Sequence, residues 1–288
     1  MFKSLSPGAI GIRGMSLPET IELAKKTGFG GVDFSIREAA DLAEAHSVNY
    51  VRELFSSADI LPGHWGLPVA WNKDDVWQED LKALPNLAAL ARDLDSTRTA
   101  TWCPPGSDTR DYDENFTWHA ERFRAIAEVL KDYGCRLGLE FIGPKTSRVR
   151  STYPFIYTLE EMMALADAIG TGNVGLLLDA WHLYTSGGSV ADLDKITADD
   201  VVVVHVNDAP EGVDREEQID NVRRLPMETG VIDLPGFMRK LAAMDYDGPV
   251  MPEPFSARVN AIAKDDPLKA AQVTAASMDK LWKAAGLD

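Results

Sequence analysis

Four residues with metal-binding side chains stand at the ends of apolar segments in the second half of the sequence: Glu140, Asp179, His205 and Glu253. Each segment has the composition of a buried strand, and the four are Arg136–Glu140, Val174–Asp179, Val201–His205 and Pro249–Glu253. An ionisable group at the end of an apolar strand is costly to bury unless a partner compensates its charge. Because this happens four times with ligands that suit hard cations, the pattern predicts one divalent metal site.

Three carboxylates and one imidazole make a donor set that is mostly oxygen and carries net negative charge. Such a set suits Mn²⁺, Mg²⁺ or Co²⁺ better than it suits a structural zinc ion. Each acid taken alone also has an ordinary structural explanation, as a helix cap or as the partner of an arginine. Recurrence at four strand ends favours the metal site over that alternative.

The elements that must position these residues alternate along the chain between strand-like and helix-like patterns. Apolar residues recur at helical spacing in several segments, including residues 16–26 and 121–130, and the segment Asp266–Ala285 has the length to close a ring against the first helix. We therefore predict an α/β fold, a (β/α)8 TIM barrel, with residues 1–288 as a single domain. Its eight strands are expected near Ala9–Arg13, Gly31–Ser35, Ile60–Trp65, Arg98–Trp102, Arg136–Phe141, Val174–Asp179, Val201–Val206 and Gly248–Glu253.

Loops that follow the strands of such a barrel form its active-site face, so the four residues are expected to converge on one mouth. Two of these loops are longer than the rest, from Gly143 to Tyr157 and from Asp208 to Ile232. Long loops on this face are candidate lids or substrate walls.

Other side chains are expected at the same mouth and are candidate substrate contacts. His64 ends the third predicted strand, and Trp102 ends the fourth, where an indole can stack on the apolar face of a sugar. Lys145 and Arg215 lie in the two long loops and are candidates for binding a phosphate or ring hydroxyls. Core packing of the tryptophan and salt pairing of the two cations with nearby acids are alternatives that the sequence leaves open.

Composition limits the class of partner. The formal net charge of −16 repels a phosphate backbone, so we do not expect nucleic acid as a substrate or partner. No apolar stretch approaches the roughly 20 residues that cross a bilayer, and the N-terminal sequence lacks the apolar region of a signal peptide. We expect no membrane partner and a cytoplasmic location.

Several short motifs resemble those of a known family, and the resemblance spans nearly the whole chain. They are Gly138-Leu-Glu140, Leu178-Asp-Ala-Trp-His182 and His205-Val-Asn-Asp208, followed by Leu225-Pro226, Gly230-Val-Ile-Asp233 and Glu253. The family is the sugar phosphate isomerase/epimerase superfamily of xylose isomerase-like TIM barrels, which includes ketose 3-epimerases, inosose dehydratases and endonuclease IV. The chain departs from the family where Leu-Pro-Gly-Glu-Gly is common, because it has Leu225-Pro-Met-Glu-Thr-Gly230.

The resemblance implies a ligand set and a substrate contact. It implies that Glu140, Asp179, His205 and Glu253 bind one divalent metal ion, often Mn²⁺, and that His182 contacts the substrate. Barrels of this type often pair through their loop faces, which makes a homodimer the expected assembly.

The chemistry of such a site follows from the cation and the carboxylates around it. A cation that grips a carbonyl and its neighbouring hydroxyl makes the adjacent C–H acidic, and a nearby carboxylate can then remove that proton. Glu140 and Glu253 are the natural catalytic pair, and the metal would stabilise the resulting enediolate. We therefore predict a metal-dependent sugar isomerase or epimerase that acts on a small-molecule sugar or polyol.

Three alternatives remain at this point. The same site would serve a lyase or dehydratase acting on a keto-sugar, a keto-inositol or an oxidised (3-keto) glycoside. An endonuclease IV-like DNA repair enzyme would need a three-metal cluster with additional histidines, whereas the chain has five histidines in all and Cys103 stands where a ligand histidine is expected. A sugar-binding barrel without catalysis would have little use for a carboxylate base beside a cation.

Overall fold

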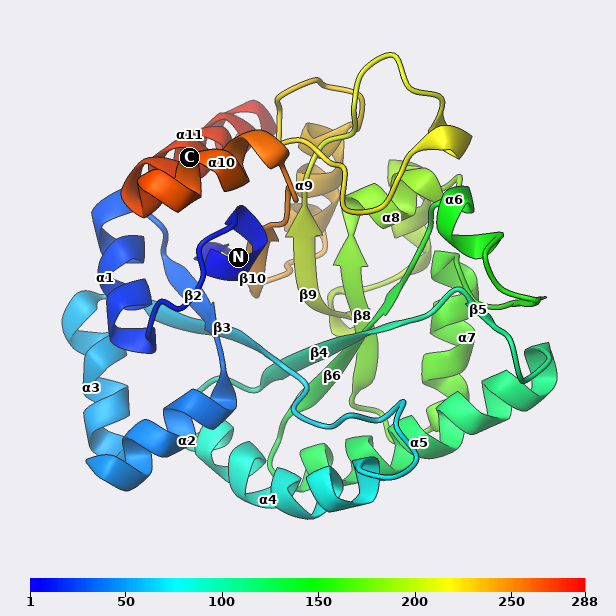
Figure 1. The fold of residues 1–288 in the computed structure, drawn as a ribbon, viewed down its shortest axis with the longest axis horizontal. Helices are drawn as coiled ribbons and strands as arrows, with labels where there is room; N and C mark the ends of the chain where they lie inside the picture. Colours follow the sequence, from blue (N-terminus) through cyan, green and yellow to red (C-terminus); the bar gives the residue numbers. More distant parts are fainter. Residues whose placement is uncertain (288) are drawn as a thin grey trace.

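Eight parallel strands close into a barrel in the computed structural model, which describes residues 1–287 (Figure 1). Neighbouring strands follow the order β1-β10-β9-β8-β6-β4-β3-β2, and the helices form a ring outside them. The predicted TIM barrel is confirmed. The barrel strands are β1 (Phe2–Leu5), β2 (Gly31–Phe34), β3 (Leu61–Gly66), β4 (Arg98–Cys103), β6 (Arg136–Phe141), β8 (Val174–Asp179), β9 (Val201–Val206) and β10 (Pro249–Pro252).

The helices begin and end at recognisable capping residues. In the first helix, the backbone N–H of Ser16 donates to the Glu19 carboxylate at 2.9 Å, and Gly28 ends the helix with φ at 80°. The last helix packs against this first one, so the predicted closure of the ring is confirmed. The α-helices are α1 (Leu17–Thr27), α2 (Ile36–Ala45), α3 (Val48–Ala58), α4 (Trp77–Asp93), α5 (Tyr112–Asp132), α6 (Lys145–Arg148), α7 (Leu159–Ile169), α8 (Ala180–Thr185), α9 (Leu234–Ala243), α10 (Ala257–Asp265) and α11 (Pro267–Ala285).

Strand burial matches a sheet that is covered on both faces. All of β9 is buried, as its run of four consecutive valines before His205 indicates. No helix within residues 1–287 combines the length and the apolar composition that crossing a membrane requires.

The position predicted for the first strand was wrong. The segment Ala9–Arg13 is not a strand, because residues 7–10 form the 3-10 helix η1 (Pro7–Ile10), which ends at Gly11 with φ at 85°. The actual first strand, β1, contains the polar residue Ser4. Its hydroxyl donates a hydrogen bond to Asp33 at 2.7 Å in the interior. This tertiary contact compensates for burying a polar side chain in the strand.

The two long loops follow β6 and β9 and contact each other beside the mouth (Figure 1). The Thr146 hydroxyl of the first loop donates to the Gln218 carbonyl of the second at 2.7 Å. The first loop carries α6 and β7 (Tyr153–Pro154), which pairs antiparallel with β5 (Gly106–Ser107). The second carries the 3-10 helix η4 (Arg215–Glu217), and the remaining 3-10 helices are η2 (Val190–Lys195) and η3 (Ala198–Asp200).

Candidate metal centre

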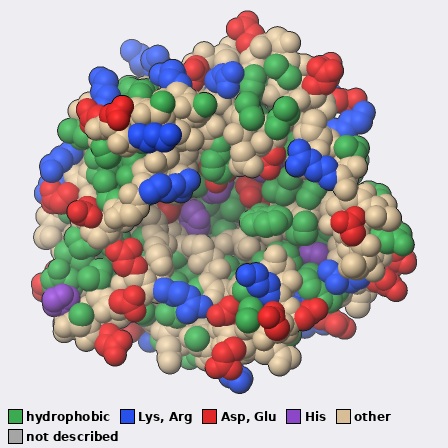
Figure 2. Space-filling model, in the orientation of Figure 1, with side chains coloured by type: hydrophobic (Ala, Val, Ile, Leu, Met, Phe, Trp, Pro, Cys, Tyr) green, Lys and Arg blue, Asp and Glu red, His purple; other side chains and the backbone are tan. Residues whose placement is uncertain are grey.

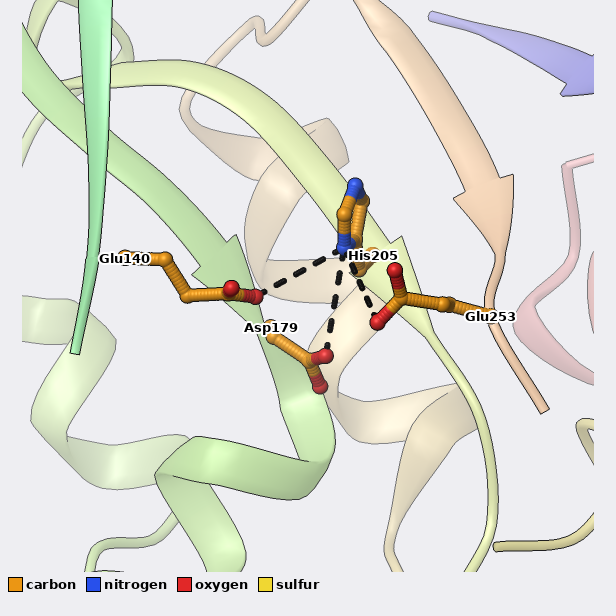
Figure 3. A group of neighbouring side chains, drawn as sticks. All are labelled: Glu140, Asp179, His205 and Glu253. Carbon is orange, nitrogen blue, oxygen red and sulfur yellow. Dashed lines mark ion pairs between the residues drawn. The ribbon is translucent and has the colours of Figure 1, made fainter. Parts of the chain in front are cut away.

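The four residues at the strand ends converge on one point, as Figure 3 shows. Glu140 lies in β6, Asp179 ends β8, His205 lies in β9, and Glu253 directly follows β10. The three carboxylates point toward Nδ1 of His205. This nitrogen lies 3.6 Å from Glu140 Oε1, 3.9 Å from Asp179 Oδ2 and 3.5 Å from Glu253 Oε2. One ligand atom from each residue lies within 4.8 Å of all the others.

The spacing and the hydrogen bonding of these atoms fit a cation. Atoms that each lie about 2.0–2.2 Å from one ion are roughly 3–4 Å apart, and the three distances from His205 Nδ1 to the carboxylates fall in that range. Within residues 1–287, Glu140 Oε1 and both ring nitrogens of His205 are buried without a hydrogen-bond partner. Buried polar atoms are rarely left in that state unless another ligand satisfies them. The cluster is therefore a candidate site for a divalent metal ion.

Asp179 has a structural role in addition to its place in the cluster. Its Oδ1 accepts a hydrogen bond from the backbone N–H of Trp181 at 2.6 Å and so caps α8. Asn207 donates to the same oxygen at 3.3 Å. Asp179 thus caps the helix through Oδ1, whereas its Oδ2 faces His205.

Asp208, at the end of the His205-Val-Asn-Asp208 motif, organises the second long loop. Its carboxylate accepts hydrogen bonds from the backbone N–H groups of Thr229, Gly230 and Ile232 at 3.0, 2.7 and 3.1 Å. The motif therefore places a candidate ligand on β9 and fixes the returning end of the loop beside it.

Arg223, which lies in the second long loop, binds two of the four residues. Its Nη1 donates to Asp179 Oδ2 at 2.8 Å and to Glu253 Oε2 at 2.9 Å, and its Nη2 donates to Asp220 at 2.9 Å. The guanidinium is buried, with only 2% of the residue exposed. The three carboxylates of the cluster and this guanidinium leave two net negative charges, before Asp220 is counted, and a divalent cation offsets them.

The position of Arg223 is fixed by two aromatic rings. Its guanidinium carbon lies 4.6 Å from the Trp181 ring centroid and 5.0 Å from that of Phe255. The only local signal for this position in the sequence is Asp220, three residues earlier. The other partners are 44 and 30 positions away in the chain, beyond the reach of any periodic pattern.

The cluster shifts the pKa values of its members in opposite directions. Burial raises the pKa of Glu140 to about 7, and the charges of Glu253 and Asp179 add to that effect. Burial alone would lower the pKa of His205, but the carboxylates of Glu253 and Glu140 outweigh it and hold that pKa well above its usual range. Burial would raise the pKa of Glu253, but His205 and Arg223 lower it instead. Before a cation binds, Glu140 and His205 thus hold protons, which offset the negative charge of the cluster.

His182 lies against the cluster as a neutral ring. Burial, followed by the charge of Arg223, lowers the pKa of this histidine to about 3. Its Nδ1 lies 3.2 Å from the backbone nitrogen of Gly143, and its Nε2 lies 4.0 Å from Glu140 Oε1 and 3.0 Å from Arg223 Nη2.

Two cavities flank the cluster, and Figure 2 shows the hollow with histidine side chains at its floor. The first, of about 410 Å³, is named here the Trp102 cavity and is lined by Trp102, Ile142, Glu140, His182, Arg223, Glu253 and Phe255 among others. The second, of about 470 Å³, is named the Arg13 cavity and is lined by Arg13, Asp33, Glu38, His64, His205 and Glu253 among others.

The predicted substrate contacts divide between these cavities and the protein surface. His182 and Trp102 line the Trp102 cavity, and the indole is 48% exposed there. His64 lines the Arg13 cavity. Lys145 forms an ion pair with Glu216 at 2.7 Å, and the Arg215 guanidinium faces the ring of Tyr184. Neither Lys145 nor Arg215 is among the lining residues of either cavity, so the structure does not bring these two cations into the site.

Replacing Arg223 by methionine is expected to destabilise the metal-free protein strongly. The change leaves two buried carboxylates without their cationic partner, which typically costs about 3–5 kcal/mol. Urea denaturation in the presence of a chelator measures the loss. The control is Arg37→Ala, which breaks an exposed pair with Asp80 and should cost less than about 1 kcal/mol. Equal stability losses in the two variants would show that Arg223 does not compensate the cluster.

Comparison with known proteins gives matches over nearly the whole chain. A family model described as xylose isomerase-like TIM barrel matches residues 21–281. An inosose isomerase of Halalkalibacterium halodurans is 27% identical over 152 residues, 52% of this chain and 50% of that protein. An inosose isomerase of Bacillus velezensis is 21% identical over 266 residues, 90% of each chain. An L-ribulose 3-epimerase of Mesorhizobium japonicum is 23% identical over 252 residues, 84% of this chain and 77% of that protein.

The chain spans about half the length of several of the curated relatives that it matches. Among solved structures, a xylose isomerase domain protein from Alicyclobacillus acidocaldarius is 29% identical, with a TM-score of 0.86 over 99% of both chains. The IOLI protein, solved with a bound zinc atom, is 18% identical with a TM-score of 0.77 over 99% of both chains, a likeness of fold alone.

Proposed function

The chain belongs to the xylose isomerase-like TIM barrel family, and on that premise we propose that it is a divalent-metal-dependent sugar isomerase or epimerase. The observation that carries the proposal is the pair of carboxylates Glu140 and Glu253, which face one candidate cation position from the wall of one cavity. Relatives named inosose isomerase and L-ribulose 3-epimerase support a small polyhydroxylated substrate with a carbonyl group.

Glu140, Asp179, His205 and Glu253 would hold the cation, and their mostly oxygen donor set favours Mn²⁺, with Mg²⁺ or Co²⁺ as alternatives. Bound there, a divalent cation would polarise the substrate carbonyl and stabilise negative charge on its oxygen. The buried Arg223 would keep Asp179 and Glu253 ionised and oriented.

The protein's own residues would move the proton. Glu140 and Glu253 reach the Trp102 cavity from different strands, so one would remove the proton next to the carbonyl and the other would return it. Return to the same carbon from the opposite face gives epimerisation, and return to the neighbouring carbon gives isomerisation. His182 is neutral and would contact a substrate oxygen, while the exposed indole of Trp102 would pack against the ring.

Elimination is the second candidate reaction, because the Arg13 cavity shares Glu253 with the Trp102 cavity and leaves room for a departing group. A three-metal nuclease is not proposed. Of the remaining histidines, His119 is buried among aromatic residues, 5.3 Å from the Trp71 ring, and His46 packs against Tyr50. Neither lies in the candidate centre formed by the described residues.

The test is incubation of the Mn²⁺-loaded protein in deuterium oxide with a panel of ketoses, keto-inositols and keto-glycosides. The proposal expects deuterium at the carbon next to the carbonyl of at least one compound, with an isomer as the product. Release of water or of an aglycone, detected by mass, would assign elimination instead. Absence of exchange across the panel, with metal bound, would refute the proposed chemistry.

Metal affinity should depend steeply on pH. Below about pH 7 Glu140 holds a proton, and His205 holds one to higher pH, so a cation must displace both protons. Affinity should therefore rise with pH, by about tenfold per unit for each proton displaced, and less steeply once Glu140 has ionised. Calorimetric titration with Mn²⁺ from about pH 5.5 to 8 measures this slope. A flat profile would mean that the ion binds elsewhere.

A further inference from the structure

The Arg13 cavity adjoins the candidate centre through His205 and Glu253, but it does not include the position between the two proposed catalytic carboxylates. Glu140 and His182 line only the Trp102 cavity, and Glu253 is the one lining residue that the two cavities share. A substrate with its reacting carbon between Glu140 and Glu253 would therefore occupy the Trp102 cavity. The Arg13 cavity, at about 470 Å³, would remain beside it, and this volume alone is within the roughly 300–1,000 Å³ of ordinary ligand pockets.

The two cavities differ in chemistry. The Trp102 cavity offers an exposed indole, Phe255 and Ile142, which suit the apolar face of one ring. Both cavities also hold carboxylates and one arginine, but Arg223 of the Trp102 cavity is already paired with Asp179 and Glu253. Among residues 1–287, no carboxylate forms an ion pair with Arg13, although the protein as a whole is acidic.

The acidic side of the Arg13 cavity is built from buried, fixed groups. Asp33 is 8% exposed, and its Oδ1 accepts hydrogen bonds from the hydroxyl of Ser4 at 2.7 Å and the backbone N–H of His64 at 3.0 Å. The His64 ring lies 3.1 Å from the same oxygen, a distance typical of an ion pair but without the alignment of a hydrogen bond. The other oxygen, Oδ2, is buried with no protein partner. Fixed acceptors beside a cationic donor are what a second set of sugar hydroxyls requires.

We propose that the substrate has two sugar-sized units, a ketose or keto-sugar with an O-linked second sugar, and that the second unit binds in the Arg13 cavity. This inference rests on the proposed function, which places the reacting unit in the Trp102 cavity. The bond between the units would pass over Glu253, the shared residue. The Arg13 cavity is then a specificity subsite, and its residues act on binding and not on proton transfer.

Gly66 gives a way to fill this cavity without disturbing the cluster. It lines the Arg13 cavity, its backbone φ lies outside the left-handed region, and a Cβ added to it would meet no atom within 4 Å. A Gly66→Phe substitution should therefore place a ring in the subsite. Arg13→Ala removes the cationic donor, and Arg37→Ala, an exposed arginine outside both cavities, is the matched control.

The experiment compares D-fructose with fructoses that carry glucose on O3, O4 or O6, using the Mn²⁺-loaded full chain. Calorimetry measures binding, and solvent deuterium exchange is followed separately. We expect the best glucosyl-fructose to bind at least tenfold more tightly than fructose. Gly66→Phe should abolish that preference, Arg13→Ala should reduce it severalfold, and Arg37→Ala should not change it.

The two readouts separate this inference from the proposed function. Preferential binding that Gly66→Phe removes supports the second subsite even if no compound exchanges deuterium, a result that would count against the isomerase chemistry alone. Equal binding of fructose and every glucosyl-fructose would overturn the inference, whether or not fructose exchanges. A preference that survives Gly66→Phe would also overturn it, because the second unit would then bind elsewhere.

Discussion

Glu140→Gln and Glu253→Gln are each expected to lower solvent deuterium exchange by about 10²–10⁴-fold, the usual contribution of a positioned acid or base. An amide has nearly the same shape as a carboxylate but cannot take up the proton. Both side chains face the same point from either side of His205 (Figure 3), so loss of either one should break the path of the proton.

These variants remove a proton carrier and also weaken a candidate metal ligand, so the metal content of each must be measured beside its exchange rate. A variant that keeps its ion and loses exchange identifies the carboxylate as the proton carrier. The control is Glu216→Gln, an exposed rim carboxylate paired with Lys145, which should change exchange by less than about twofold. Undiminished exchange in both site variants would refute the assignment of the catalytic pair.

Removal of the metal is the second change with a large expected effect. Lewis-acid stabilisation of a developing negative charge is worth several kcal/mol, so a chelated sample should lose at least about a hundredfold in exchange rate. Added Mn²⁺ should restore the rate, and Co²⁺ or Mg²⁺ should restore it in part. The barrel itself should remain folded, because its strands and helices are joined by a continuous apolar core.

Chelators can also inhibit by binding to the protein, so the control is the same chelator saturated beforehand with Mn²⁺. Dialysed, metal-free protein should behave as the chelated sample does. Full activity of protein shown to contain no ion would contradict the proposed role of the cation.

Much of the barrel follows from the sequence because buried parallel strands leave continuous apolar runs. The runs that end in Glu140, Asp179 and His205 coincide with β6, β8 and most of β9. The first strand was misplaced because the short apolar run after Pro7 fits a strand and a helical turn equally well. The polar residues of β1 hid the true strand, since Ser4 is explained only by its contact with Asp33.

The candidate centre could also be predicted. Once the strands are located, the residues at the ends of parallel strands must meet at one mouth of the barrel. The pairing of Arg223 with Asp179 and Glu253 could not be predicted, since this arginine lies in an irregular loop and its side chain reaches residues of two distant strands. The direction of a loop side chain depends on its tertiary partners. For this reason the sequence left two roles open for Lys145, substrate binding and salt pairing, and the structure shows its ion pair with Glu216.

The proposed chemistry requires four side chains from separate strands to hold one divalent cation. Counting Mn²⁺ bound per chain by electron paramagnetic resonance, in the native protein and in His205→Ala, tests this most directly. We predict one ion per native chain and a loss of at least about a hundredfold in affinity in the variant, since ligand removal costs several kcal/mol. A native chain that binds no ion, or a variant that binds one as tightly as the native protein does, would contradict the claim.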